Sequence, residues 1–282
     1  MTGEKRGERR KLGDFPDSSE PDHVRSQYRS QNNLAVRIRT HELYSETDVD
    51  FASWILDALS WHGDERVLDV GCGAGFYIDA VKQRATRYIA GDLSLGMLRE
   101  LKDHSVPRIN LDAQRLPFRR QAADVILANH MLYHVPDIDR ALVEFRRVLG
   151  ARGRLVAATN SARNMAELAA LQREVMVQLG APSAQRFRTN LTFTLENGAQ
   201  FLSKHFAHVE RRDLHDALVF PEAQPVIDYL ASSFERYVDY LPDHLSWQDV
   251  ARTLRTILEP RIKQHSEFRV NKLSGVFICW NN

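Results

Sequence analysis

Cysteine is nearly absent from this sequence: Cys72 and Cys279 are the only two in 282 residues. Two cysteines are too few for a disulfide framework or for a zinc site built on cysteine, and their scarcity suits a reducing compartment. The sequence also shows no apolar leader segment and no apolar run near the roughly 20 residues that a membrane helix needs. These absences predict a cytoplasmic protein without a membrane partner.

Net charge is also nearly missing. The chain carries 38 lysines and arginines against 37 aspartates and glutamates, a formal net charge of +1 at pH 7. Such a balance creates no field over the whole protein that would attract nucleic acid or an anionic membrane. We therefore do not expect nucleic acid as a partner.

The composition is that of a globular protein, with 43% hydrophobic residues, and the length favours one elaborated domain over two. Residues 1–27 are dense in charged residues, Gly, Pro and Ser and are expected to form a disordered tail. We expect cap helices over 28–62 and the main domain over 63–282. Helical insertions in that domain are expected at about 163–205 and 222–265.

Short β-rich runs alternate with amphipathic segments between residues 65 and 160. This rhythm predicts an α/β fold of the Rossmann-like, doubly wound type, with a mostly parallel seven-stranded sheet, an N-terminal helical cap and an inserted helical lid. The expected strands are 66–71, 87–92, 106–112, 123–129 and 153–160, with closing strands at 208–214 and 275–280. A helix is expected to end at Gly150, and Gly153 to start the next strand.

The stretch VLDVGCGAGF, residues 67–76, follows the first expected strand and contains Gly71, Gly73 and Gly75. Backbone N–H groups at such a strand-to-helix turn favour ligands, and glycine lets the backbone approach them closely. A dinucleotide site would need a glycine where Phe76 stands, and a P-loop would need a following Gly-Lys-Ser/Thr. Both of these phosphate-binding classes are excluded.

Together with Asp69, the glycines form D-x-G-x-G-x-G, which resembles motif I of the class I S-adenosylmethionine-dependent methyltransferases. Three further elements resemble this family in the same order along residues 66–160: RYIAGDLSLGML, the LDAQ-x-LPF segment and NHMLYHVPD. RRVLGARG also resembles the family's R-V-L-x-P-G-G, with Ala151 and Arg152 in place of Pro-Gly. The likeness is strongest to the ubiquinone/menaquinone-methyltransferase-like small-molecule group.

This resemblance implies S-adenosyl-L-methionine as the cofactor. It places Asp69 near the methionine amino group, Asp92 on the ribose hydroxyls and Asp112 at the adenine amino group. The cofactor-binding residues expected on these grounds are Asp69, Gly71, Cys72, Gly73, Gly75, Asp92, Leu93, Met97, Asp112, Ala113, Gln114 and Asn129.

Purely structural roles stay open beside these assignments. Asp69 could simply end a strand, Asp92 could cap the following helix and Asp112 could start a turn. Cys72 is read as a small filler between glycines. His130 and His134 are the expected catalytic residues, as bases, and the alternative is that they are held by backbone or cofactor.

Two other groups of side chains have a functional and a structural interpretation. A metal site at His205, His208 and His215 lacks further ligands, so surface histidines are favoured and no metal is expected. Four aromatic residues could wall a substrate pocket or pack in a core. They are Phe234, Tyr237, Tyr240 and Trp247.

The sequence thus predicts methyl transfer to an oxygen or nitrogen of a small-molecule acceptor. Bacterial specialised metabolism is one context in which such an enzyme would act. RNA methylation is a second hypothesis, but NHML stands where amino methyltransferases of nucleic acids carry N/D-P-P-Y/F/W. A third is a regulatory protein that binds the cofactor without catalysis. The identity of the acceptor and the oligomeric state stay open.

Overall fold

The computed structural model describes residues 31–101, 105–180, 192–234 and 244–281. The expected tail, 1–27, lies outside these residues. Within them the strands form one seven-stranded sheet in the order β3-β2-β1-β4-β5-β7-β6. The strands are β1 (Arg66–Val70), β2 (Arg87–Asp92), β3 (Arg108–Asn110), β4 (Ala123–Leu127), β5 (Leu149–Asn160), β6 (His208–Phe220) and β7 (Phe268–Trp280).

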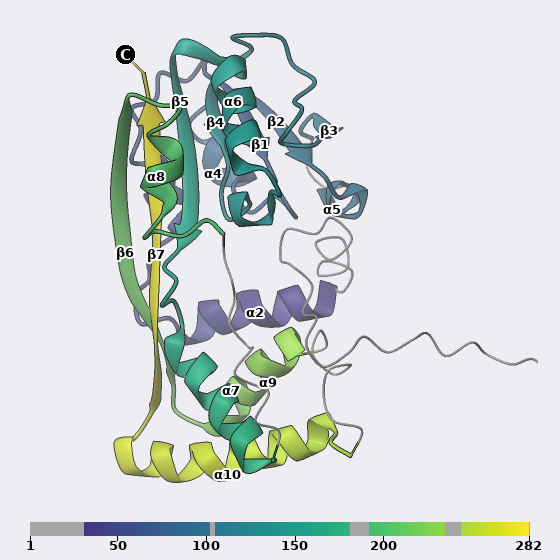
Figure 1. Cartoon of the computed structure of the whole chain (residues 1–282), viewed down its shortest axis with the longest axis vertical. Coiled ribbons are helices and arrows are strands. Elements are labelled where there is room, and N and C mark those ends of the chain that lie inside the picture. Colours follow the sequence, from purple (N-terminus) through teal and green to yellow (C-terminus); the bar gives the residue numbers. More distant parts are fainter. Residues whose placement is uncertain (1–30, 102–104, 181–191, 235–243, 282) are drawn as a thin grey trace, which may run out of the picture.

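Helices connect these strands and cover both faces of the sheet (Figure 1). They are α2 (Gln31–Tyr44), α3 (Phe51–Leu56), α4 (Ile78–Lys82), α5 (Leu95–Glu100), α6 (Ile138–Val148), α7 (Ala166–Gln178), α8 (Gly198–Leu202), α9 (Ala223–Phe234) and α10 (Trp247–His265), with the short 3-10 helix η2 (Leu132–His134). None of the described helices is both long enough and apolar enough to cross a membrane.

The expected mostly parallel, seven-stranded sheet is confirmed. β1 pairs in parallel with β2 on one side and with β4 on the other, and β7 pairs antiparallel with β5 and β6. The chain therefore leaves β1 in one direction along the sheet and returns on its other side. Ligands of open α/β sheets bind outside the carboxyl ends of the strands at such a switch point.

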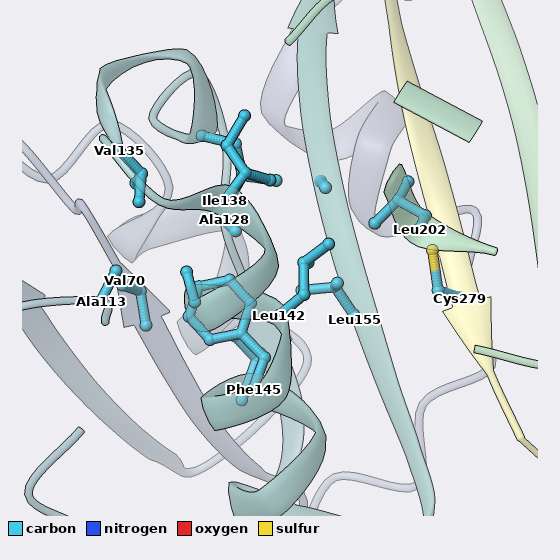
Figure 2. Packing of buried hydrophobic residues seen from close by; sticks show 14 of the residues in the cluster. Val70, Ala113, Ala128, Val135, Ile138, Leu142, Phe145, Leu155, Leu202 and Cys279 are labelled. Atoms are coloured by element: carbon cyan, nitrogen blue, oxygen red, sulfur yellow. The ribbon is translucent and has the colours of Figure 1, made fainter. Parts of the chain in front are cut away.

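Each face of the sheet has its own core. On one face α6 buries Leu142 and Phe145 against Leu155 of β5, as Figure 2 shows. The buried positions of α6 recur every three or four residues, which is the spacing that turns one helix face to a sheet. On the other face α3 and α4 pack Ile55 and Ile78 against β1 and β4. The switch point thus sits on a rigid frame.

The predicted boundary at Gly150 and Gly153 is wrong, because α6 ends at Val148 and β5 begins directly at Leu149. Ala123 of β4 pairs with Leu149, whereas the next paired residue, Val125, lies opposite Arg154. The intervening glycines therefore form an irregular part of the strand and not a helix-ending turn. The third strand is also shorter than expected, 108–110 in place of 106–112.

β6 and β7 form a long ribbon that projects beyond the rest of the sheet. Pairing of β5 with β7 stops at Asn160, opposite Ser274, whereas β6 and β7 remain paired as far as Phe220 and Phe268. The ribbon therefore extends on the side of the carboxyl ends of the parallel strands. Helices α7, α9 and α10 pack there around a third core, and α2 lies beside α9 (Figure 1).

A mostly buried ion pair joins β6 to β7 beside the end of α2. The Lys272 Nζ lies 2.5 Å from a carboxylate oxygen of Asp216 and donates to Ser45 Oγ at 2.7 Å. Burial and the nearby Lys272 charge lower the pKa of His41 to about 4. The end of α2 is thus fixed to β6 and β7 by polar contacts, which include a bridge between Ser45 and Leu218.

Candidate cofactor site

The glycine loop is fastened to the neighbouring strand. The backbone N–H groups of Gly71 and Cys72 both donate to the carbonyl of Gly91 on β2, at 2.7 and 3.0 Å. A Cβ on Gly75 would lie 2.5 Å from side-chain carbons of Ile78 on α4 and of Leu101 directly after α5, whereas a Cβ on Gly73 would meet none of the described residues within 4 Å. Gly75 therefore serves packing, and Gly73 leaves bare backbone open to a ligand.

Asp92 is held against this loop. One carboxylate oxygen accepts from the N–H of Gly73 at 2.9 Å, and the other accepts from the N–H of Ser94 at 2.7 Å. Burial raises the pKa of Asp92, and these backbone hydrogen bonds oppose the shift. The residue that caps α5 is Ser94, whose hydroxyl accepts from the N–H of Met97, so Asp92 is not the helix cap. Its carboxylate is available for the predicted ribose contact.

Asp69 is the last residue but one of β1, and its side chain lies in the interior. The residue is 1% exposed, and its carboxylate accepts a hydrogen bond of 2.6 Å from the hydroxyl of Tyr88. Burial raises the pKa of Asp69 to about 7; the Tyr88 hydrogen bond lowers it and the nearby Asp92 raises it. The carboxyl group of Asp69 lies next to the glycine loop, and its contact with the amino group of the cofactor stays a prediction.

The adenine side of the predicted site is made by α5 and the turn after β3. Met97 is buried and Leu93 is half-buried. Asp112 is exposed and starts a turn, in which its carboxylate accepts from the backbone N–H and the side-chain amide of Gln114. Ala113 is buried behind this turn. The turn is therefore observed, and the role of Asp112 at adenine stays a prediction.

The end of β4 brings the third part of the site. Asn129 is buried; its side-chain oxygen accepts from the N–H of Ala158 at 3.0 Å, and its Nδ2 has no hydrogen-bond partner in the part of the chain described here. His130 follows in a left-handed conformation, with φ of 54°. Its backbone N–H donates to the Ala158 carbonyl at 2.8 Å, and its ring lies 5.6 Å from that of Phe51.

The two histidines predicted as bases differ in surroundings. Burial lowers the pKa of His130 to about 4, and His134 lowers it further by charge repulsion. His130 is therefore neutral at physiological pH and a weak base. His134 is half-buried on η2, with its ring centroid 4.5 Å from that of Tyr133. Backbone and ring contacts thus hold both residues near the end of β4.

Cys72, inside the loop, was interpreted from the sequence as a small filler. Cys72 is buried, and burial raises the pKa of its thiol, which agrees with a small filler and not with a reactive group.

Tyr77 is a residue of the site that no sequence pattern indicated. It stands directly before α4, is 6% exposed, and its hydroxyl has no hydrogen-bond partner among the described residues. No motif marks this tyrosine, because its neighbours come from distant elements.

The remaining candidates lie apart from the loop. His205 lies 2.9 Å from a carboxylate oxygen of Asp139, and His208 stacks on Trp280. No group of three His, Cys, Asp or Glu residues that could hold a metal occurs within the described ranges. Trp247 packs against the third core, whereas the side chains of the other predicted aromatic residues, Phe234, Tyr237 and Tyr240, lie outside the described part.

The sheet order, the glycine loop after β1 and the acid that ends β2 together define a class I S-adenosylmethionine-dependent methyltransferase domain. Residues 68–157 match the family model described as "Methyltransferase domain". This segment is a methyltransferase domain, it is similar in sequence to quinone methyltransferases, and the cofactor of the class is S-adenosyl-L-methionine.

Two curated relatives illustrate the likeness. A demethylmenaquinone methyltransferase of Thermobifida fusca is 37% identical over 106 residues, which cover 35% of this chain and 45% of the relative. A malonyl-[acyl-carrier protein] O-methyltransferase of Hamiltonella defensa is 28% identical over 166 residues, 58% of this chain and 60% of the relative. The chain spans about half the length of these relatives, so neither activity nor substrate of the whole chain follows from them.

Solved structures agree in fold. The YcgJ protein of Bacillus subtilis is 17% identical with a TM-score of 0.53, over 82% of this chain and 98% of that chain. The [4+2]-cyclase SpnF is 18% identical with a TM-score of 0.54, over 94% and 97%. At such low identity the likeness shows the fold alone.

Proposed function

We propose that this chain transfers a methyl group from S-adenosyl-L-methionine to an oxygen or nitrogen of a small-molecule acceptor. One observation carries the proposal: the backbone N–H of Gly73 donates to the carboxylate of Asp92 at 2.9 Å. This hydrogen bond fixes the glycine loop and the proposed ribose acceptor, Asp92, relative to each other at the switch point of the sheet. Two further observations, made on the described residues, fit a ligand at this place: the Nδ2 of Asn129 has no partner among them, and a Cβ at Gly73 would meet none of them. The cofactor would supply an electrophilic methyl group on a sulfonium.

The chain's own contribution is binding, orientation and the exclusion of water. Asp92 and the turn at Asp112 would fix the nucleoside, and Asp69 would attract the amino group. The helices around the β6–β7 ribbon lie beyond the carboxyl ends of the parallel strands, which is the end of the sheet where this site lies. They would cover an acceptor bound there. Holding two reactants in line can contribute about 7 kcal/mol or more to barrier lowering.

A hydroxyl acceptor needs a base, whereas a neutral amine does not. His134 is the stronger candidate for this role, because His130, with a pKa near 4, remains neutral and binds protons weakly. His130 would instead orient the acceptor against Phe51, whose ring lies 5.6 Å from its own.

We further propose a cytoplasmic enzyme of bacterial biosynthetic metabolism. The two curated relatives are named for different acceptors, a demethylmenaquinone and a malonyl group on an acyl-carrier protein. Their shared feature is a substrate other than nucleic acid, and the balanced charge of this chain agrees with that.

The test combines binding with turnover. Calorimetric titration with S-adenosylhomocysteine should give saturable binding, and cofactor with a labelled methyl group should label a small molecule in a panel of phenols, carboxylic acids and amines. Labelling of RNA, with binding that weakens steeply as salt rises, would favour the RNA hypothesis. Cofactor binding without turnover on any acceptor would favour the regulatory one.

A further inference from the structure

The hydroxyl of Tyr77 is a buried polar group that the described residues leave unpaired. The tyrosine is 6% exposed, and its ring packs in the core between the sheet, α3 and α4. A buried hydroxyl without a hydrogen bond is destabilising, so such groups usually meet a partner in the functional state. The position of Tyr77, directly after the glycine loop and before α4, places it next to the cofactor cradle.

Three acidic or phenolic groups lie near Tyr77. Burial raises the pKa of Tyr77 well above its ordinary range, and the nearby Asp69, Tyr133 and Asp50 raise it further. These neighbours belong to the end of β1, to η2 and to the residue that caps α3. The hydroxyl therefore stays neutral, and Tyr77 lies near residues from three elements at the carboxyl edge of the sheet.

We propose that the Tyr77 hydroxyl binds the amino-acid end of S-adenosyl-L-methionine, with its oxygen accepting a hydrogen bond from the ammonium group. Asp69 and Asp50 make this place favourable for a cation. Asp92, which is held at the loop by Gly73, is the proposed acceptor for the ribose, and this assignment leaves the amino-acid end for the Asp69 side of the loop. This inference rests on the proposed function, since it assumes that this cofactor binds.

The test compares two ligands on the full-length chain. S-adenosylhomocysteine carries the amino-acid group, whereas 5′-methylthioadenosine lacks it. Tyr77→Phe should weaken binding of the first by about tenfold or more and leave binding of the second unchanged, as expected for one hydrogen bond to a charged group. Tyr44→Phe, on α2 beside Phe220, is the matched control and should change neither affinity. Equal losses for both ligands, or no loss for either, would overturn the inference.

Thermal unfolding gives a second readout that a structural role would move the other way. Removing an unpaired buried hydroxyl should leave the melting temperature of the ligand-free protein equal or higher, while the rise caused by S-adenosylhomocysteine becomes smaller. A lower melting temperature with an undiminished ligand-induced rise would overturn the inference and assign the hydroxyl to the fold. Wild-type protein that binds neither ligand would overturn the proposed function itself, and this inference with it.

Discussion

The backbone N–H of Gly73 and the carboxylate of Asp92 are joined by a hydrogen bond of 2.9 Å across 19 positions of sequence. The bond links the turn after β1 to the end of β2, so the two parts of the predicted nucleoside site are positioned by each other. Gly73 itself has a φ of 54°, a left-handed backbone conformation that favours glycine. Changes at either residue should therefore affect the same ligand.

Gly73 and Gly75 should respond differently to alanine. At Gly73, with φ of 54°, a Cβ meets no neighbour, so Gly73→Ala should destabilise the fold by only about 1–2 kcal/mol while reducing cofactor affinity. At Gly75 a Cβ would overlap Ile78 and Leu101, and Gly75→Ala should cost roughly 2–5 kcal/mol. Denaturant unfolding and calorimetry measure the two effects. Equal stability losses at both positions would contradict this division of roles.

The buried carboxyl of Asp69 should make stability depend on pH. Its pKa is about 7 in the folded protein and about 3.9 when unfolded, so the folded state binds more protons between these values. Stability should therefore fall as pH rises from about 4 to about 7, by roughly 4 kcal/mol from this group. Asp69→Asn should remove that part of the fall.

Denaturant unfolding between pH 4 and pH 8 checks this expectation, with Asp79→Asn as the control. Asp79 lies on α4 with an exposed side chain. A stability difference between wild type and Asp69→Asn that stays constant with pH would show that the Asp69 carboxyl does not titrate in this range.

The two histidines should be separable by kinetics once an acceptor is known. On a hydroxyl acceptor, His134→Asn should lower kcat by about 100-fold with little change in cofactor affinity. His130→Asn should have a smaller effect, since asparagine tolerates the left-handed backbone and His130 is a weak base. Single-turnover assays with labelled cofactor measure both. A larger loss at His130 than at His134 would reverse the assignment.

The ion pair of Lys272 with Asp216, beside the end of α2, should contribute to the stability of the fold. The side chains of Lys272 and Asp216 are only 14% and 10% exposed, so Lys272→Met should destabilise the protein by about 3–5 kcal/mol through an uncompensated buried charge. The exposed pair of Arg269, on β7, with Glu46, which follows α2, provides the control. Arg269→Met should cost about 1 kcal/mol or less. Similar losses in chemical unfolding would argue against a special role of the buried pair.

The sheet and the glycine loop could be predicted from sequence because their signals are local. The buried run of β4 and the alternation of strands and helices reflect only burial and chain direction. The positions of Asp69 and Asp92 follow in the same way, since parallel strands end at one edge of the sheet.

Features that depend on distant partners could not be predicted. The proposed role of Tyr77 depends on its neighbours Asp50, Asp69 and Tyr133, which come from three separate elements. The pairing of Lys272 with Asp216 likewise depends on the register of β6 and β7. The start of β5 at Leu149 was also mispredicted, because Gly150 and Gly153 signal a break equally well in a turn and in an irregular strand.

The most direct test of the central claim is calorimetric titration of wild type and Asp92→Ala with S-adenosylhomocysteine, with Asp79→Ala as the control. We expect saturable binding to wild type and to the control, and a loss of affinity of about tenfold to a hundredfold for Asp92→Ala in a protein that remains folded. Absence of binding to wild type at millimolar ligand, or the same affinity in folded Asp92→Ala, would contradict it.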